Sequence, residues 1–412
     1  MVDRFARRQA FSMLQRLQQG CLVICEPDRE PVTFGQSQAE ADITAKMVVK
    51  HPSVYRQLAL NGSIGAGEAY MAGLWQSPDL VGLVRLFARN LELVNSLDRC
   101  GPLLQGLVRR VAHGVNRNTL SGSKKNIRAH YDLSNEFFGL FLDRSMMYSS
   151  AVYPDADATL EQASVYKMQR VCERLNLSPQ DHLLEIGTGW GSLAIHAARE
   201  FGCRVTTTTL SSAQYDYACA QVAQQGLSDR VKVIKQDYRR LTGTYDKLVS
   251  IEMIEAVGHQ YYSEYFARCS SLLKDDGLML IQAITVADQR YDQALRSVDF
   301  IQKYIFPGGC LPSVAVIAGH IATDTDMQVV GLEDITRDYA LTLRDWRQRF
   351  VGQIERVKAL GFDDNFIRMW EFYLAYCEGG FRERAIGTAQ FVMAKPRCQT
   401  LPRPGINLGS AS

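Results

Sequence analysis

The residues best suited to chemistry form a glycine-rich turn at positions 183–191. An apolar stretch that carries Glu185 runs into glycines at three alternate positions, Gly187, Gly189 and Gly191. Glycine is needed where a backbone turns sharply from a strand into a helix and must pass within contact distance of a ligand. The turn therefore predicts a ligand site. A tight turn that only packs a strand on a helix is the alternative.

The elements around this turn indicate how it is positioned. Apolar segments at residues 182–186, 203–209, 231–235, 247–251 and 278–283 alternate with helical patterns. This alternation is typical of an α/β fold with a doubly wound parallel sheet, in which ligands bind at the carboxyl ends of the strands. We expect Glu185, Gly187, Thr209, Asp237 and residues 251–255 to face one crevice. The helix-rich, aromatic residues 290–381 would roof it.

The length of 412 residues fits two domains, and 46% hydrophobic with 22% charged residues is an ordinary globular composition. We predict a smaller N-terminal accessory domain at residues 1–100, mainly helical, with some strand near 31–34 and 41–49. A linker at 101–128, a catalytic domain at 129–396 and a flexible tail at 397–412 would follow. A helix predicted at residues 1–19 either caps its own domain, which we favour, or lies on a membrane.

The composition also indicates the cellular compartment of the protein. No apolar run is long enough for a transmembrane helix, and the basic N-terminus lacks the features of a secretory signal. The ten cysteines form no C-x-x-C pair, which favours free thiols in a reducing cytosol and no metal site. We therefore expect a cytoplasmic protein.

The net charge of +2 is unevenly distributed. Residues 101–129 contain no acidic residue and six basic ones: Arg109, Arg110, Arg117, Lys124, Lys125 and Arg128. Such a stretch attracts anionic surfaces, either phospholipid headgroups or nucleic acid. A solvated linker is the alternative.

The glycine turn is similar to the first motif of S-adenosylmethionine (SAM) methyltransferases. Further segments resemble the cyclopropane-fatty-acyl-phospholipid synthases, the family that includes the mycolic acid cyclopropane synthases. They are residues 61–71, 130–134, 209–214, 251–258 and 299–313. The Glu-Met-Ile-Glu-Ala-Val-Gly version at 252–258 is similar to the plant-type branch. The resemblance extends over nearly the whole chain.

The resemblance implies a SAM site. The backbone at Gly187 and Gly189 would approach the methionine end of SAM, and Asp237 would accept a hydrogen bond from the adenine amino group or merely cap a helix. The other residues implied for cofactor binding are Tyr148, Ser149, Glu185, Gly191, Thr209, Leu210, Gln214, Gln236 and Ile251. The second predicted strand ends without an acidic side chain, which argues against an NAD enzyme.

The family reaction passes the sulfonium methyl group to a cis double bond of an acyl chain, and the resulting carbocation loses a proton as a ring closes. A dry, aromatic-lined tunnel is needed to keep water from this cation. Residues 137–141, 261–266, 304–306 and 370–376 are aromatic-rich and are candidates for its walls. Each single aromatic residue fits an ordinary core equally well.

The resemblance further implies a bicarbonate ion as the base, with Glu255, Tyr339, Ile284, Ser150 and Gln282 at its site. Ser150 stands where cysteine is usual and Gln282 where histidine is usual. A glutamine amide donates a hydrogen bond but cannot be protonated, so any role that needs imidazolium is lost.

Cys377 matches a cysteine that is often assigned as catalytic in this family. The chemistry needs no thiolate, and a cysteine on an apolar helix is usually a small buried hydrophobe.

The leading hypothesis is a cyclopropane-fatty-acyl-phospholipid synthase that acts on membrane phospholipid acyl chains, peripherally at the inner membrane face. A fatty-acyl C-methyltransferase that gives a methylene- or methyl-branched chain is one alternative, and a non-catalytic lipid-binding protein is another. A nucleic-acid methyltransferase is disfavoured because no Asn-Pro-Pro-Tyr motif follows the fourth strand. The sequence leaves a homodimer open.

Overall fold

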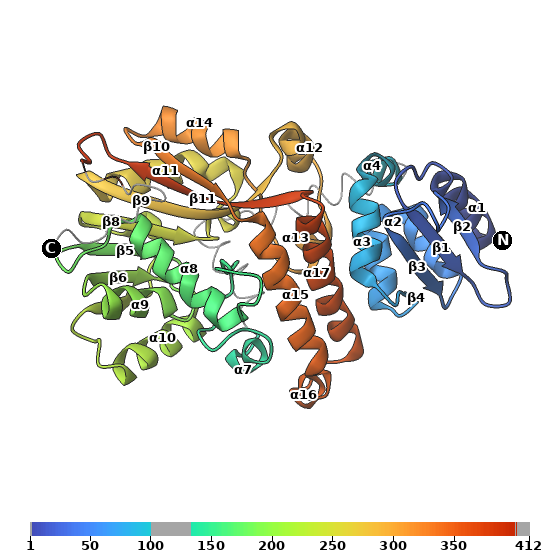
Figure 1. The fold of residues 1–412 in the computed structure, drawn as a ribbon, viewed down its shortest axis with the longest axis horizontal. Coiled ribbons are helices and arrows are strands. Elements are labelled where there is room, and N and C mark those ends of the chain that lie inside the picture. Colours follow the sequence, from blue (N-terminus) through green and yellow to red (C-terminus); the bar gives the residue numbers. More distant parts are fainter. Residues whose placement is uncertain (1, 100–132, 400, 402–412) are drawn as a thin grey trace.

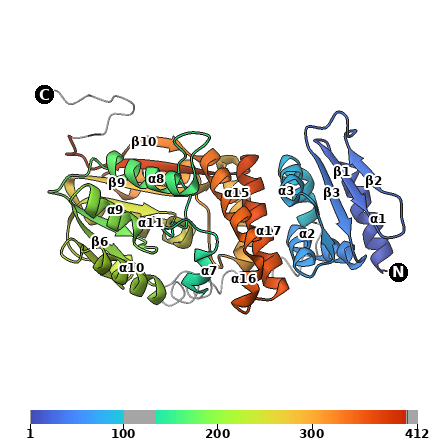
Figure 2. The ribbon, with the colours of Figure 1, turned by 60° about the horizontal axis from the view of Figure 1, so that its bottom comes forward.

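The computed structural model describes residues 2–99, 133–399 and 401. A four-stranded sheet and a seven-stranded sheet lie at opposite ends of the molecule, with the long helices α15 (Thr336–Gly352) and α17 (Asp364–Arg382) between them (Figures 1 and 2). The basic stretch 101–128 lies outside the described residues.

The N-terminal unit contains more strand than its sequence pattern predicts. Its sheet has the order β2-β1-β3-β4, with β1 and β3 parallel. Strand β1 was not predicted; it is a short, largely buried run between a turn and a loop, where no polar alternation marks a strand. The elements are α1 (Val2–Leu14), β1 (Cys21–Cys25), β2 (Val32–Gly35), β3 (Thr44–Val49), α2 (Ser53–Met71), β4 (Trp75–Gln76), α3 (Leu80–Arg89) and α4 (Leu91–Arg99).

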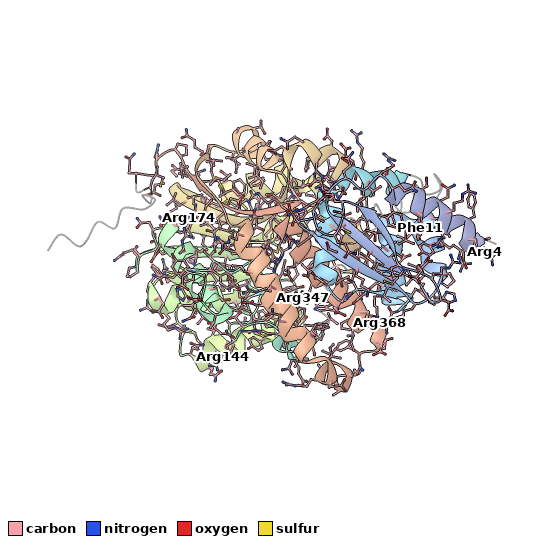
Figure 3. The ribbon with its side chains drawn as sticks, turned by 45° about the vertical axis from the view of Figure 1, so that its right-hand side comes forward. Arg4, Phe11, Arg144, Arg174, Arg347 and Arg368 are labelled. Atoms are coloured by element: carbon pink, nitrogen blue, oxygen red, sulfur yellow. The ribbon has the colours of Figure 1, made fainter. Side chains whose placement is uncertain are left out.

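Helix α1 packs against its own sheet. The rings of Phe11 and Phe34 lie 5.0 Å apart, and Arg7 Nε donates to Glu26 Oε1 at 2.8 Å. Figure 3 labels Phe11 and Arg4 on this helix at the edge of the molecule. The first turn leaves Val2 and Phe5 63% and 66% exposed. Within the described ranges, no helix is long and apolar enough to cross a membrane.

The segment 62–75 contains four glycines, and the structure nevertheless places most of it in helix α2. The helix is interrupted only at Gly62, whose φ is 56°. Gly67 allows close approach, because a Cβ there would lie 2.5 Å from the Phe300 ring. Through this contact and the ring pair Tyr70–Phe372 at 5.6 Å, the N-terminal unit packs on the rest of the molecule.

The larger sheet has the order β10-β11-β9-β8-β5-β6-β7. The five predicted strands are confirmed and run parallel, whereas β10 and β11 pair antiparallel at one edge and were not predicted. The strands are β5 (His182–Ile186), β6 (Arg204–Thr208), β7 (Val231–Ile234), β8 (Tyr245–Ile251), β9 (Leu273–Val286), β10 (Gln328–Asp334) and β11 (Ile386–Ala394).

Helices cover both faces of this sheet and roof the ends of its strands (Figure 1). Those beside the sheet are α8 (Leu160–Arg174), α9 (Ser192–Glu200), α10 (Ser212–Gln224), α11 (Tyr262–Ser271) and α14 (Val314–Asp324). The remaining ones are α7 (Asn135–Gly139), α12 (Tyr291–Leu295), α13 (Phe300–Tyr304) and α16 (Ile354–Ala359), together with α15 and α17. The expected tail begins bound to the body, because the backbone N–H of Arg397 donates to Asp275 at 3.1 Å.

Candidate active site

A cavity of about 600 Å³ lies at the carboxyl ends of β5, β6 and β8, as the strand pattern predicts. Most of the predicted site residues line it: Tyr148, Ser149, Glu185, Gly187, Gly189, Thr209, Leu210, Gln214, Gln236, Ile251, Glu255, Ile284, Tyr339 and Cys377. Four predicted residues are absent from its wall: Ser150, Gly191, Asp237 and Gln282.

The three glycines of the turn have different structural roles, although all have positive φ, at 100°, 53° and 94° in chain order. A Cβ at Gly187 would lie 2.5 Å from the Met253 side chain, and one at Gly191 would lie 3.1 Å from Ala218. A Cβ at Gly189 would meet nothing within 4 Å, and Gly189 lines the cavity. Packing therefore requires the outer two glycines, and the middle one leaves room for a ligand.

Buried charges lie beneath this turn. Burial raises the pKa of Glu185 to about 8, although the Thr207 hydroxyl donates to its Oε2 at 2.5 Å. Lys167, on α8, is fully buried and donates to Ser149 Oγ at 2.6 Å; burial lowers its pKa to about 8. Lys167 could not be singled out from the sequence, because a lysine in an amphipathic helix ordinarily faces solvent.

The polar residues after β6 and β7 differ in where they point. The Thr209 hydroxyl donates to Gln214 Oε1 at 2.9 Å, and both residues line the cavity. Asp237 instead accepts from the backbone N–H of Arg239 at 3.0 Å and from its guanidinium at 2.8 and 2.7 Å. It thus caps the short helix η1 (Tyr238–Arg240), which was the alternative weighed for it. A contact with adenine stays a prediction.

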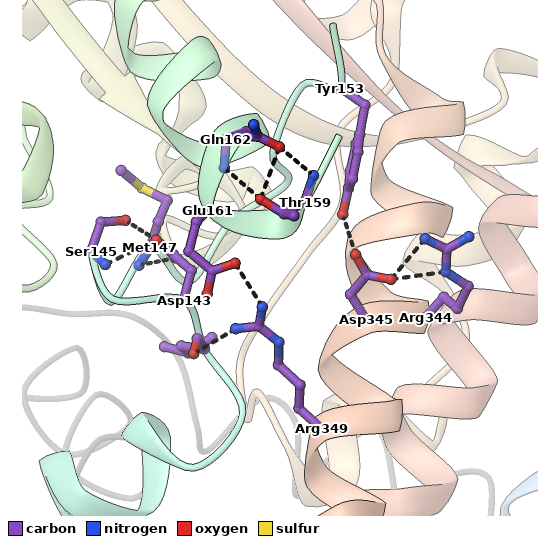
Figure 4. A network of polar contacts seen from close by, with 11 residues as sticks. Asp143, Ser145, Met147, Tyr153, Thr159, Glu161, Gln162, Arg344, Asp345 and Arg349 are labelled. Atoms are coloured by element: carbon purple, nitrogen blue, oxygen red, sulfur yellow. Dashed lines mark hydrogen bonds and ion pairs between the residues drawn. The ribbon is translucent and has the colours of Figure 1, made fainter. Parts of the chain in front are cut away.

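The loop that carries Tyr148, Ser149 and Ser150 is fixed between α8 and α15 (Figure 4). Asp143 accepts from two backbone N–H groups of this loop, at 2.9 and 3.3 Å. Arg349 of α15 donates to Glu161 of α8 at 2.8 Å. The Tyr153 hydroxyl donates to Asp345 of α15 at 2.9 Å. Arg349 also donates to the backbone carbonyl of Leu142 at 3.2 Å, so the loop is bonded to α15 near both of its ends, at Leu142 and at Tyr153.

Away from the glycine turn, the polar residues of the site converge on Glu252. Its Oε1 accepts from the backbone N–H of Ser150 at 2.9 Å and from Gln282 Nε2 at 2.8 Å. Its Oε2 accepts from the Tyr339 hydroxyl at 2.8 Å. Glu252 lines the cavity and has a φ of 50°, a left-handed conformation that favours glycine. Burial raises its pKa, opposed most by Lys167.

Two residues on the side away from Glu252, Gln390 and Arg174, orient the amide of Gln282. Gln390, on β11, donates to Gln282 Oε1 at 3.0 Å, and Arg174 donates to Gln390 Oε1 at 2.8 Å. Because the oxygen of Gln282 is occupied as an acceptor, its nitrogen must point toward Glu252. Gln390 was missed by sequence analysis because β11 itself was missed.

Glu255 lies beside this centre and is held more loosely. Its Oε1 accepts from the backbone N–H of Ile284 at 2.5 Å, and its buried Oε2 has no hydrogen-bond partner within the described part of the chain. Burial and then the neighbouring charge of Glu252 raise its pKa to about 8.

Burial also raises the pKa of the Cys377 thiol, which accords with the expectation that no thiolate is needed.

The residues expected around bicarbonate therefore form two sets. Glu255 and Ile284 bind each other, whereas Ser150, Gln282 and Tyr339 all donate to Glu252. The donors assigned to a separate anion are already bound to a carboxylate of the chain, so they do not fit bicarbonate. The Glu-Met-Ile-Glu segment contained the signal, but only its second glutamate was predicted to belong to the site.

The cavity continues as an apolar channel into the N-terminal unit. The large unit lines it with Phe306, Tyr373 and Tyr376, and with Phe372, which packs on Trp75. The N-terminal unit lines it with Leu14, Leu22, Trp75, Leu83 and Phe87. Two of the aromatic segments expected to supply walls thus do so.

The other aromatic residues form core instead. Phe137, Phe138, Phe141 and Trp370 pack together in the main hydrophobic cluster, with no more than 1% of any of them exposed. Tyr262, Tyr265 and Phe266 belong to a second core cluster against the sheet. For these residues the ordinary-core interpretation is the correct one.

The strand order, the glycine turn after β5 and the cavity above it are those of a Rossmann-like methyltransferase. The chain matches the family model described as mycolic acid cyclopropane synthetase over residues 119–391. The protein belongs to this family and is a SAM-dependent methyltransferase.

Relatives of known function match most of the chain. It is 36% identical over 378 residues to tuberculostearic acid methyltransferase UfaA1 of Mycobacterium tuberculosis, covering 90% of this chain and 88% of that protein. It is 35% identical over 359 residues to the cyclopropane-fatty-acyl-phospholipid synthase of Escherichia coli K12, covering 87% and 88%.

Among solved structures, the mycolic acid cyclopropane synthase CmaA1 bound to S-adenosylhomocysteine and CTAB is 30% identical, with a TM-score of 0.62. The cyclopropane synthase MmaA2 of M. tuberculosis is 28% identical, with the same TM-score of 0.62. Each covers 66% of this chain and 98% of its own. About a third of the present chain therefore has no counterpart in these two structures.

Proposed function

We propose that this protein transfers a methylene group from SAM to the cis double bond of unsaturated phospholipid acyl chains, as a cyclopropane-fatty-acyl-phospholipid synthase. One observation carries the proposal: a single cavity joins the glycine turn and the two glutamates to an apolar channel. An acyl chain is the kind of substrate that such a channel suits, and the E. coli relative bears the corresponding name.

The residues of the glycine turn fit SAM, which supplies an electrophilic methyl group when bound. Gly189 leaves room for the ligand, and the Glu185 carboxyl group and the Thr209–Gln214 pair present polar groups beside it. Tyr148 borders the ligand from the fixed loop, its hydroxyl 2.9 Å from that of Tyr373. The apolar walls exclude water from the reacting double bond.

The proposal assigns the catalytic domain to residues 129–396 and a lipid-binding accessory role to residues 1–100. In the accessory unit, the exposed Val2 and Phe5 share the first turns of α1 with Arg4 and Arg8. Apolar and basic side chains on one exposed helix suit a peripheral site on an anionic membrane. The basic stretch 101–128 would add to this attraction.

The experiment that tests the activity uses vesicles of unsaturated phospholipid with SAM. We expect each modified double bond to gain the mass of one CH2, measured by mass spectrometry of the released fatty acids. Saturated phospholipid vesicles are the control and should give no product. Absence of any mass gain with unsaturated vesicles would overturn the proposal.

Membrane attraction is tested by varying anionic lipid content and salt. We expect turnover on vesicles to rise with anionic lipid and fall with salt, because each basic residue near the surface contributes on the order of 1 kcal/mol. Replacing Lys124, Lys125 and Arg128 with glutamine should reduce the salt dependence and leave SAM affinity unchanged. A wild-type protein indifferent to salt would show that this stretch is only a linker.

A second candidate product is a methylene- or methyl-branched chain, since the same carbocation can lose a different proton. The 36% identity to a tuberculostearic acid methyltransferase over 90% of this chain favours keeping this candidate. Fragmentation of the product distinguishes a ring from a branch in the vesicle experiment.

A further inference from the structure

The carboxylate of Glu252 occupies a cradle built for a planar anion. Backbone, amide and phenol donors from residues 150, 282 and 339 converge on its two oxygens, at 2.9, 2.8 and 2.8 Å. A carboxylate offers about four lone-pair sites. Three donors therefore leave one acceptor site on Oε2, and the residue borders the cavity.

We propose that Glu252 is the catalytic base of this enzyme and takes the place of a bound bicarbonate ion. This inference rests on the proposed function, because it assigns the proton acceptor of that reaction. It also explains the departures from the family pattern. The donors that would hold a free anion, Ser150, Gln282 and Tyr339, hold a carboxylate supplied by the chain.

The proton transfer accompanies ring closure. Once the methyl group is bonded to one carbon of the double bond, the other carbon carries a positive charge. A C–H bond of the new methyl group then breaks, and its electron pair forms the bond that closes the three-membered ring. The proton passes to Glu252 Oε2, which gives a neutral carboxylic acid, and the acyl chain leaves uncharged.

Gln282 suits this role better than a histidine would. A protonated imidazole beside Glu252 would form an ion pair with it and weaken its tendency to accept a proton. A neutral amide orients the carboxylate without adding charge. The bonds Arg174–Gln390–Gln282 fix that orientation, so the amide nitrogen is presented as the donor.

A separate anion at this site would be unfavourable. It would lie beside the carboxylate of Glu252, in a site where burial raises the pKa of both Glu252 and Glu255. Two negative charges at contact distance in a poorly solvated site repel strongly. Lys167 and three hydrogen-bond donors oppose the effect of burial on the pKa of Glu252, whereas the charge of Glu252 adds to burial and raises the pKa of Glu255 to about 8. Glu252 is therefore the member of the pair that ionises first.

The first test measures whether the wild-type protein uses bicarbonate. Turnover is measured in buffer stripped of carbon dioxide and again with added bicarbonate, and binding of [13C]bicarbonate is followed by NMR. We expect equal rates and no binding. A rate that falls on removal of bicarbonate, or saturable binding to the wild-type protein, would overturn the inference.

The second test uses Glu252→Gly. Glycine adopts the positive φ at this position without strain, so the variant should fold and bind SAM normally. It leaves the three donors facing an empty space of carboxylate size. We expect turnover to fall at least about 10²-fold, bicarbonate to restore part of it, and [13C]bicarbonate to bind.

Glu252→Gln is the matched control. It keeps the length and planarity of the side chain but cannot accept the proton, so it should lose turnover to a similar extent and gain nothing from bicarbonate. Ordinary turnover in this variant would show that Glu252 is only structural and would overturn the inference.

The two proposals fail in different ways. If the wild-type protein forms no methylated lipid, the proposed function fails, and the [13C]bicarbonate comparison between wild type and Glu252→Gly still reports on the cradle. If product forms but depends on bicarbonate in the wild-type protein, only the assignment of Glu252 fails.

Discussion

The two ends of the cavity are built in different ways. At the glycine end, the ligand surface is made by one continuous turn, residues 187–191, with positive φ angles at alternate positions. At the glutamate end, residues 150, 252, 282 and 339 come from four separate segments and meet only in the folded protein. The first end is local and appears directly in the sequence, whereas the second depends on tertiary packing.

The residues at the two ends of the cavity also need different properties. The glycine end needs empty space for the ligand and a backbone with positive φ. A larger side chain fills that space and disfavours that conformation. The glutamate end needs carboxyl groups with particular pKa values. A glutamine has nearly the same shape as a glutamate but cannot take up or release a proton in this way. Variants at the two ends should therefore lose different measurable quantities: ligand affinity at one and turnover at the other.

The largest effect is expected for Glu255→Gln. The buried carboxyl group of Glu255 lies at the cavity wall beside Glu252, the proposed base, and can pass the accepted proton onward, which an amide cannot do. Its loss should therefore lower turnover roughly 10²-fold or more, within the range for a positioned acid–base group. SAM affinity, measured by calorimetry, should remain. A stable variant with ordinary turnover would contradict the assignment and reduce Glu255 to a packing residue.

The same variant should alter how stability depends on pH. The pKa of Glu255 is about 8 in the folded protein against an ordinary 4.5. Between these values the folded state keeps a proton that the unfolded state has released, so this group's contribution to the unfolding free energy falls as pH rises, by at most about 1.4 kcal/mol per pH unit. Glu255→Gln lacks this loss, so relative to wild type it should become more stable from pH 5 to pH 8.

Denaturant unfolding at several pH values, for wild type and variant in parallel, measures this difference. A constant difference in unfolding free energy across the range would show that the Glu255 pKa is not raised. The slope isolates one carboxyl group, since Glu185 and Lys167 are unchanged in both proteins.

At the glycine end, Gly189→Val should weaken SAM binding at least about 10-fold, because the side chain would project into the ligand space. Gly226→Val is the matched control. It also has positive φ and nothing within 4 Å of a Cβ, but it lies outside the cavity. Both variants should lose similar stability, and only Gly189→Val should lose affinity. Equal SAM affinities would remove Gly189 from the site.

The smallest effect is expected for Asp237→Asn. If Asp237 leaves Arg239 to accept from the adenine amino group, the variant should bind SAM roughly 5-fold more weakly, which corresponds to one hydrogen bond of about 1 kcal/mol. An inosine analogue of SAM, which lacks that amino group, is the control and should bind both proteins equally. Loss of stability without loss of affinity would identify Asp237 as a helix cap alone.

The fold could be predicted where the sequence pattern is strong. Five parallel strands lie where apolar runs precede helices, and β5 has the bounds predicted for it. Strand β10 was missed because its apolar run, residues 329–332, is short and its residues are mostly exposed. Strand β11 was missed because it follows the long helix α17 with almost no intervening loop.

Many residues of the site could be predicted from the sequence, but the hydrogen bonds between them could not. Fourteen predicted residues line one cavity, since strand ends and motifs indicate position. Which donor binds which acceptor depends on side-chain geometry across long sequence separations, and this is why Glu252, Lys167 and Gln390 were missed. Each is a polar residue whose burial becomes visible only when the helices and strands are packed.

Helix α17 has a consequence for any attempt to shorten the protein. One side of it packs on α15, and another carries Phe372 against Tyr70 and Trp75. Arg85 and Arg89 also bind Glu383, just beyond the helix, at 2.7 Å. A chain trimmed to the family-matching residues would uncover this apolar strip in the channel wall. Such a fragment should aggregate, because large exposed apolar patches make soluble monomers self-associate. We therefore expect the N-terminal unit to keep the catalytic part of the chain soluble by covering this strip.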